Sequence, residues 1–154
     1  MAGEAMSTRE EQLAAFDAAF PKAQLLESPL SFRRASPASG QAVMLLPGAS
    51  GTSEFFCLVA SLLREGGCDP VLVDYPGTIG PRALARETEK LAVGLGLAAP
   101  VAAGCSYSAW WLQYAATSAP FAALILCNGF VEAEDLKGHP LFDHAAIAAT
   151  PAAE

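Results

Sequence analysis

The most restrictive feature of this sequence is a long segment that carries no charged side chain. Residues 91–131 contain no Asp, Glu, Lys, Arg or His. A membrane-spanning helix would need about 20 continuous apolar residues, but prolines, glycines and polar residues such as Ser106 and Asn128 interrupt this segment. We therefore expect a strand, a helix and a second strand that are buried on several sides, as in a parallel sheet covered on both faces.

Apolar runs of strand length alternate with segments of helical periodicity along the chain. Strands are predicted at 42–46, 71–74, 100–104 and 122–127, with a further short strand near 31–35. Helices are predicted at 7–20, from about 53 to 65, at 84–95 and at 108–117. This alternation is typical of parallel strands joined by right-handed crossovers. The predicted fold class is α/β, a mostly parallel sheet with helices on both faces.

The pentapeptide Gly104-Cys105-Ser106-Tyr107-Ser108 lies between a predicted strand and a predicted helix. In a nucleophile elbow, a serine at such a turn projects its hydroxyl out of the sheet. The residues two before and two after it must be small, because strand and helix approach closely there. Gly104 meets this demand, and Ser108 replaces the usual second glycine. Ser106 is thus a candidate nucleophile, while the alternative is an ordinary turn with Ser106 or Ser108 as a helix N-cap.

The loop Pro47-Gly48-Ala49-Ser50-Gly51 follows the first strand of the alternating pattern. In the nucleophile-elbow arrangement this loop supplies one backbone N–H to an oxyanion hole, and the residue after the nucleophile supplies the other. The candidate donors are therefore Ala49 (or Ser50) and Tyr107. Alternatively, the loop is a glycine-rich turn that serves geometry alone.

Several short runs carry a resemblance to a known family: Leu45-Leu46-Pro47, Ser50-Gly51-Thr52, Phe55-Phe56, Tyr75-Pro76 and the run Leu-Ile-Leu-Cys-Asn-Gly-Phe at 124–130. From about residue 42 to 130 the sequence resembles the α/β-hydrolase superfamily, and within it the maspardin-like proteins. The resemblance implies a cytoplasmic protein with a hydrolase fold. It also implies a role in protein interaction, because the maspardin group is generally viewed in that way.

The resemblance also implies how the chain is organised. Family members continue beyond the nucleophile with a cap region and two more strands, which present an acid and a histidine in the order Ser, Asp/Glu, His. Only 48 residues follow Ser106. We therefore expect a partial, C-terminally truncated α/β-hydrolase fold. Residues 1–40 would form an N-terminal helix and an irregular lead-in, 41–131 the hydrolase-like core, and 132–154 the start of the cap or a tail.

A catalytic triad can be assembled from the remaining residues only formally. Asp135 and His144 follow Ser106 in the right order, and His139 is the other histidine. No strand is predicted after residue 127 to bring either group within hydrogen-bond reach of the serine. Solvent-facing cap residues are the favoured interpretation of both histidines.

Composition excludes several classes of function. The net charge is −7 and the isoelectric point is about 4.7, so no nucleic-acid partner is expected. The adjacent Arg33-Arg34 is interpreted as a solvated strand or loop edge.

The four cysteines lack metal-ligand spacing and suit a reducing compartment. Residues 94–99 match G-x-G-x-x-A but close a helix instead of following a strand. No cofactor, metal, signal peptide or transmembrane segment is therefore expected, and the predicted compartment is the cytoplasm.

Three hypotheses remain open. The first is a maspardin-like interaction scaffold with little or no hydrolytic activity, which binds a protein partner. The alternative is a serine hydrolase that acts on an ester or a similar small acyl substrate through Ser106. The third is an incomplete product of a longer gene, in which the strand at 122–127 is an uncovered edge. Such an edge predicts self-association.

Overall fold

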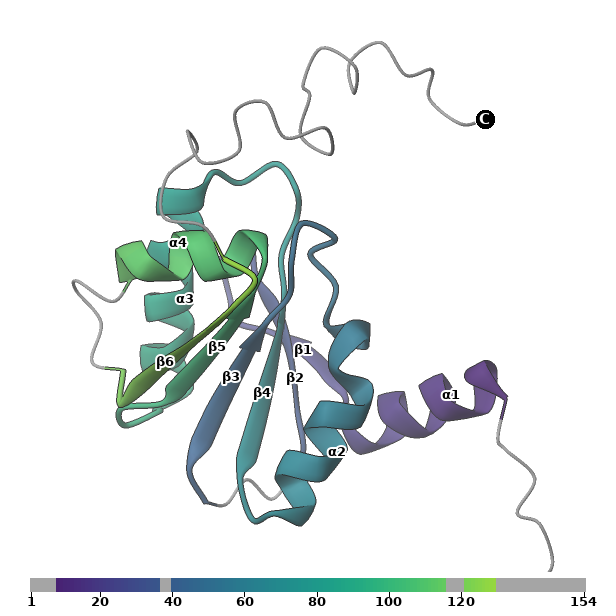
Figure 1. The fold of residues 1–154 in the computed structure, drawn as a ribbon. Coiled ribbons are helices and arrows are strands. Elements are labelled where there is room, and N and C mark those ends of the chain that lie inside the picture. The colour runs from purple at the N-terminus through teal and green to yellow at the C-terminus, as the bar shows by residue number, and fades with distance from the viewer. Residues whose placement is uncertain (1–7, 37–39, 116–120, 130–154) are drawn as a thin grey trace, which may run out of the picture.

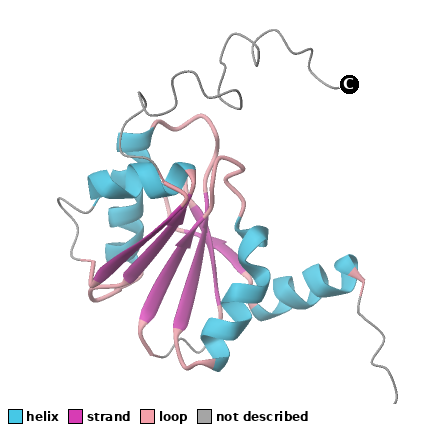
Figure 2. Cartoon of the chain, in the orientation of Figure 1, coloured by secondary structure: helices cyan, strands magenta, loops and turns pink. Residues whose placement is uncertain are grey.

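The computed structural model describes residues 8–36, 40–115 and 121–129. Its strands form one sheet in the order β1-β2-β4-β3-β5-β6 (Figures 1 and 2). They are β1 (Lys22–Gln24), β2 (Ser31–Arg34), β3 (Ala42–Leu46), β4 (Asp69–Asp74), β5 (Val101–Cys105) and β6 (Ala123–Cys127). Strands β3 to β6 pair in parallel, whereas β1 and β2 are antiparallel to their neighbours.

Helices cover both faces of this sheet. They are α1 (Arg9–Ala19), α2 (Cys57–Glu65), which follows a 3-10 turn η1 (Ser53–Phe56), α3 (Pro81–Gly94) and α4 (Tyr107–Ala115). Helices α3 and α4 lie on one face, and α1 and α2 lie on the other (Figure 1). The predicted α/β class is therefore confirmed. Within the described ranges, no helix has the length and apolar character that a membrane crossing requires.

Alternate residues of the central strands serve the two cores, because successive side chains of a strand point to opposite faces. One core joins strand residues such as Met44 and Val71 to α3 and to Trp111 of α4. The other joins Val43 and Leu72 to helices α1 and α2. Both faces of β3 and β4 are buried along their whole length, which explains their nearly continuous apolar sequence.

Helix α1 begins at a capping box. The backbone N–H of Glu11 donates to the Thr8 hydroxyl at 3.2 Å, and the backbone N–H of Thr8 donates to the Glu11 carboxylate at 2.7 Å. These bonds satisfy donors that the first helical turn leaves unpaired. The helix predicted at 7–20 is thus present, and it begins at Arg9 with Thr8 as its N-cap.

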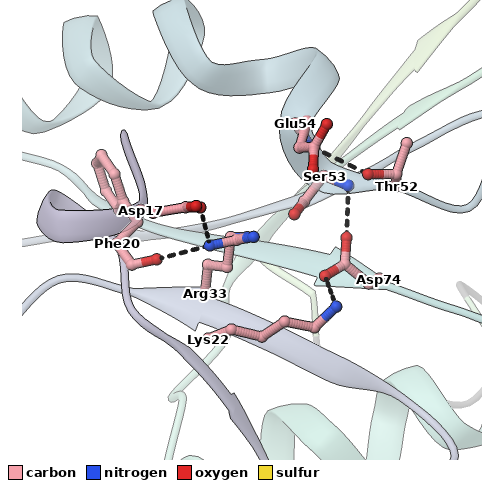
Figure 3. Close-up of polar contacts among 8 residues, drawn as sticks. All are labelled: Asp17, Phe20, Lys22, Arg33, Thr52, Ser53, Glu54 and Asp74. Atoms are coloured by element: carbon pink, nitrogen blue, oxygen red, sulfur yellow. Dashed lines mark hydrogen bonds and ion pairs between the residues drawn. The ribbon is translucent and has the colours of Figure 1, made fainter. Parts of the chain in front are cut away.

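The interpretation of Arg33 and Arg34 as a solvated edge is wrong. Arg33 is buried and forms a 2.6 Å ion pair with Asp17, while it also donates to the carbonyl of Phe20 (Figure 3). Arg34 pairs with the buried Asp69 at 2.5 Å. Both arginines lie on β2, between β1 and β4, and Arg33 also packs over the Phe16 ring of α1, so this buried charge requires a partner.

The buried face of α2 also differs from the one the sequence favours. Phe55, Val59, Leu62 and Leu63 have helical spacing, yet only Leu63 packs against the core, and the other three side chains are exposed. The buried residues that face the sheet are Phe56 and Ala60, and the partly buried Cys57 and Leu63 pack beside them. The 3-10 turn at Ser53–Phe56 alters the helical register, and the small Ala60 lets the helix approach the sheet. Strand β1 was not predicted either, because its three exposed residues carry no apolar alternation.

Candidate active site

Ser106 is the only residue between the end of β5 and the start of α4. Its φ of 55° lies in the left-handed region, which residues with a Cβ seldom adopt. The backbone N–H of Ser106 donates to the carbonyl of Cys127 on β6 at 2.8 Å. The half-buried serine is therefore held in a strained turn at the carboxyl edge of the sheet, as a nucleophile elbow requires.

Gly104 and Ser108, on either side of Ser106, are small for different physical reasons. A Cβ on Gly104 would lie 2.9 Å from the backbone nitrogen of Ala109, so only glycine fits there. Ser108 is fully buried, and its hydroxyl accepts from the N–H of Cys105 at 2.7 Å and donates to the carbonyl of Leu46 at 2.6 Å. The departure from glycine is thus accommodated by a hydroxyl that joins the ends of β3 and β5.

The loop after β3 runs directly beside the elbow. A Cβ on Gly48 would lie 3.4 Å from the Cβ of Ser106 and 3.9 Å from its hydroxyl oxygen. The next residue, Ala49, is exposed. Tyr107 is the first residue of α4, so its N–H is one of the backbone donors of the first helical turn that have no acceptor within the helix. Ser106, Tyr107 and the segment containing Ala49 therefore meet at one edge of the sheet.

The remaining predicted site residues cannot be located relative to Ser106. Asp135, His139 and His144 lie outside the described residues. Their roles as base and orienting acid stay predictions.

Two further residues at the end of β4 contact the same loop. The carboxylate of Asp74 accepts from the backbone N–H of Ser53 at 2.5 Å and pairs with Lys22 at 2.9 Å (Figure 3). The hydroxyl of Tyr75 donates to the carbonyl of Pro47 at 2.8 Å and also contacts the carbonyl of Gly48. The sequence indicated only a strand end here, although Asp74 and Tyr75, which end the apolar run at 71–73, are a signal that could have been used.

Burial and hydrogen bonding shift the pKa values of these groups. Burial alone would raise the pKa of the Asp74 carboxyl, but hydrogen bonds from Lys22 and Ser53 and the Lys22 charge hold it below its ordinary value. Burial raises the pKa of Tyr75 to about 12 and also raises the pKa of Tyr107. Asp74 is therefore a fixed acceptor, and Tyr75 is a neutral donor, at neutral pH.

A depression of about 490 Å³ lies beside Asp74 and Tyr75 and is also lined by Lys22 and Thr52. Ser106 does not line it. In the described part of the chain, no three His, Cys, Asp or Glu residues lie close enough to hold a metal ion.

No protein-family model matches this chain, and neither does any curated protein. Solved structures do match. A carboxylesterase from the thaumarchaeon Nitrososphaera gargenis is 16% identical, with a TM-score of 0.64 over 84% of this chain and 54% of its own. The Aspergillus niger epoxide hydrolase is 18% identical, with a TM-score of 0.62 over 77% of this chain and 37% of its own. The chain has an α/β-hydrolase fold.

A third hydrolase-fold structure extends this comparison. The N-formylmaleamic acid deformylase from Pseudomonas putida is 23% identical, with a TM-score of 0.54 over 65% of this chain and 42% of its own. The chain thus spans roughly two fifths to one half of the length of these three neighbours. None of these comparisons singles out the maspardin-like proteins within the superfamily.

The contact at Gly104 gives a first prediction. Gly104→Ala should lower the free energy of unfolding by about 1–3 kcal/mol, because the added methyl group meets rigid backbone of α4. Urea denaturation measures the change. Gly77→Ala is the matched control, since an added Cβ at Gly77 meets nothing within 4 Å. Equal stability of the two variants would contradict the close approach of β5 and α4.

The lowered pKa of Asp74 gives a second prediction. The stability that its carboxylate contributes is present above the ordinary pKa of 3.8 and is lost as the pH falls through the folded value. Asp74→Asn should therefore cost about 1–3 kcal/mol near neutral pH, and the difference from the wild type should shrink below about pH 4. Denaturant titrations over this pH range measure it. A difference that is independent of pH would contradict the assignment.

Proposed function

We propose that this protein is an acyl hydrolase in which Ser106 is the nucleophile. The observation that carries the proposal is the strained turn at Ser106, with a φ of 55°, directly beside Gly48 of the loop after β3. A buried strand, a one-residue turn and a helix at this place suit the exposure of a reactive hydroxyl. The hydrolases named among the structural neighbours are consistent with this class of chemistry.

The proposed reaction begins with attack of the Ser106 hydroxyl oxygen on the carbonyl carbon of an ester or similar acyl compound. The hydroxyl proton passes to a general base, and the backbone N–H groups of Ala49 (or Ser50) and Tyr107 donate to the oxyanion. Collapse of the tetrahedral intermediate expels the leaving group and leaves an acyl-serine, which water then hydrolyses. On the basis of chain order, we propose His144 as the base and Asp135 as the residue that orients it, with His139 as the other candidate base.

The identity of the nucleophile favours acyl transfer over epoxide opening. If Ser106 opened an epoxide, it would form an ether with the ring carbon, and water does not readily cleave an ether. An acyl-serine is an ester, which water attacks at its carbonyl. Among the chemistries named for the neighbours, carboxylester hydrolysis therefore fits Ser106 better than epoxide hydrolysis does.

A third prediction tests the nucleophile. The wild-type chain should be labelled covalently by a fluorophosphonate probe, and Ser106→Ala should not, because the probe forms a stable bond with an activated serine oxygen. Intact-mass spectrometry measures the adduct. Ser61→Ala is the control, since Ser61 is an exposed serine on α2 and should leave labelling unchanged. A folded wild-type chain that acquires no adduct would overturn the acyl-hydrolase proposal.

A second candidate function rests on a different observation. Strand β6 pairs with β5 on one side, and among the described residues no strand pairs with its other side. Its side chains carry no charge, and Ile125 and Leu126 are 49% and 44% exposed. Native sheet edges usually carry a charge, a proline or a cover that prevents pairing. This edge favours the maspardin-like alternative, an interaction scaffold that binds a protein partner or a second copy of itself.

A fourth prediction tests this edge. The wild-type chain should self-associate in a concentration-dependent manner, and Ile125→Lys should shift it towards the monomer, because a charged residue opposes pairing of two apolar edges. Light scattering over a range of concentrations measures the mass. Val93→Lys is the matched control, since Val93 is an exposed apolar residue on α3. A wild-type chain that stays monomeric at all concentrations would count against self-association.

The compartment is also part of the proposal. All four cysteines are free thiols, and free thiols persist in reducing compartments. This supports the cytoplasm as the site of action.

A further inference from the structure

One side chain at the end of β4 contacts the loop after β3 at several points. The hydroxyl of Tyr75 donates to the carbonyl of Pro47 at 2.8 Å and also contacts the carbonyl of Gly48. The backbone N–H of Tyr75 donates to the carbonyl of Gly51 at 2.9 Å. These contacts bracket Ala49 and Ser50, the residues that would donate to an oxyanion.

The same residue contacts the helix that begins at the elbow. The ring of Tyr75 packs edge-on against Trp111 of α4, with ring centroids 6.0 Å apart and an interplanar angle of 84°. Trp111 is fully buried, and α4 starts directly after Ser106. Tyr75 therefore joins the loop to the helix that carries the other candidate donor, the N–H of Tyr107. Edge-to-face packing of this kind favours one relative orientation of the two rings.

The surroundings of Tyr75 leave the loop little freedom. Gly51 has a φ of 66°, and a Cβ on it would overlap the carbonyl oxygen of Tyr75. The neighbouring Asp74 holds the N–H of Ser53 at 2.5 Å. Tyr75 itself is buried, and burial raises its pKa to about 12. Its hydroxyl thus stays protonated, and able to donate, at neutral pH.

We propose that Tyr75 is a positioning residue, which fixes the distance between the loop at 48–51 and Ser106 so that the oxyanion donors are preorganised. The inference rests on the proposed acyl-hydrolase function. Preorganised donors stabilise a developing oxyanion without reorganisation during the reaction. Small displacements of such groups reduce rates strongly. Tyr75 itself touches neither the serine nor the acyl group in this scheme, so it acts only through the loop.

The test compares Tyr75→Phe with the wild type in two independent measurements. The variant keeps the ring that packs on Trp111 and removes only the hydroxyl. Amide hydrogen exchange of residues 48–53 should accelerate roughly fivefold or more, because the loop loses a hydrogen bond worth about 1 kcal/mol. Inactivation by a fluorophosphonate should slow roughly 10- to 100-fold. The maximal rate constant of inactivation should fall, and the probe concentration that gives half of this maximal rate should stay the same.

Tyr114→Phe is the matched control. It removes the same hydroxyl from a partly exposed tyrosine of α4 and should leave loop exchange and inactivation unchanged. Loop exchange equal to the wild type in Tyr75→Phe would overturn the proposal, whatever the reactivity. Faster exchange with unchanged inactivation would also overturn it, because the role would then be structural only. A wild-type chain that does not react at all would instead refute the proposed function, and the exchange data alone would then decide whether Tyr75 holds the loop.

Discussion

The reversal of the chain at Ser106 is the constraint on which the rest of the structure depends. Because β5 ends at Cys105 and α4 begins at Tyr107, one residue must turn the chain from strand to helix. Its left-handed conformation costs on the order of 1–3 kcal/mol. The surrounding bonds offset this cost, since the Ser106 N–H pairs with β6 and the Ser108 hydroxyl joins β5 to β3. The tight turn also brings α4 against Gly104.

Sheet order then determines which groups meet this turn. Strands β4, β3 and β5 are adjacent and parallel, with Leu46 of β3 opposite Gly104 of β5. Their carboxyl ends therefore open at one edge, where ligands bind in folds of this class. β5 supplies Ser106, β3 supplies the loop, and β4 supplies Asp74 and Tyr75, which fix that loop. The position of each segment at this edge therefore depends on contacts with the neighbouring strand as well as on its own sequence.

The sequence predicted the parts of this arrangement that depend on local rules. The elbow could be found from the sequence, because all its parts lie within a few positions of one another. They are an apolar strand, a small residue, Ser106 and a segment of helical periodicity. The α/β class followed from the alternation of strands and helices and is confirmed. The roles of Ala49 and Tyr107 as oxyanion donors, and of Asp135 and His144 as acid and base, stay predictions.

The sequence could not reveal features that depend on packing across the sheet. Tyr75 reaches Pro47 only because β3 and β4 pair in their particular register. Arg33 is buried because β1 and α1 cover it, and β1 itself has no apolar pattern that would predict it. The exposure of Phe55 and Val59, despite their helical spacing, follows from the 3-10 turn that precedes α2. For Tyr75 and Arg33 the deciding contacts join segments that are distant in sequence.

The two candidate functions share a structural connection. The carbonyl that accepts from the Ser106 N–H belongs to Cys127, the last residue of β6. Just beyond this strand, a Cβ on Gly129 would lie 2.7 Å from the Cβ of Ala109 on α4, so the chain after β6 is packed tightly against the elbow helix. Strand β6, which no other described strand pairs on its outer side, is thus the strand that holds the strained serine. The two proposed functions therefore rest on neighbouring parts of one structure, because β6 is joined to Ser106 by a hydrogen bond and the chain after it packs against Ala109 of α4.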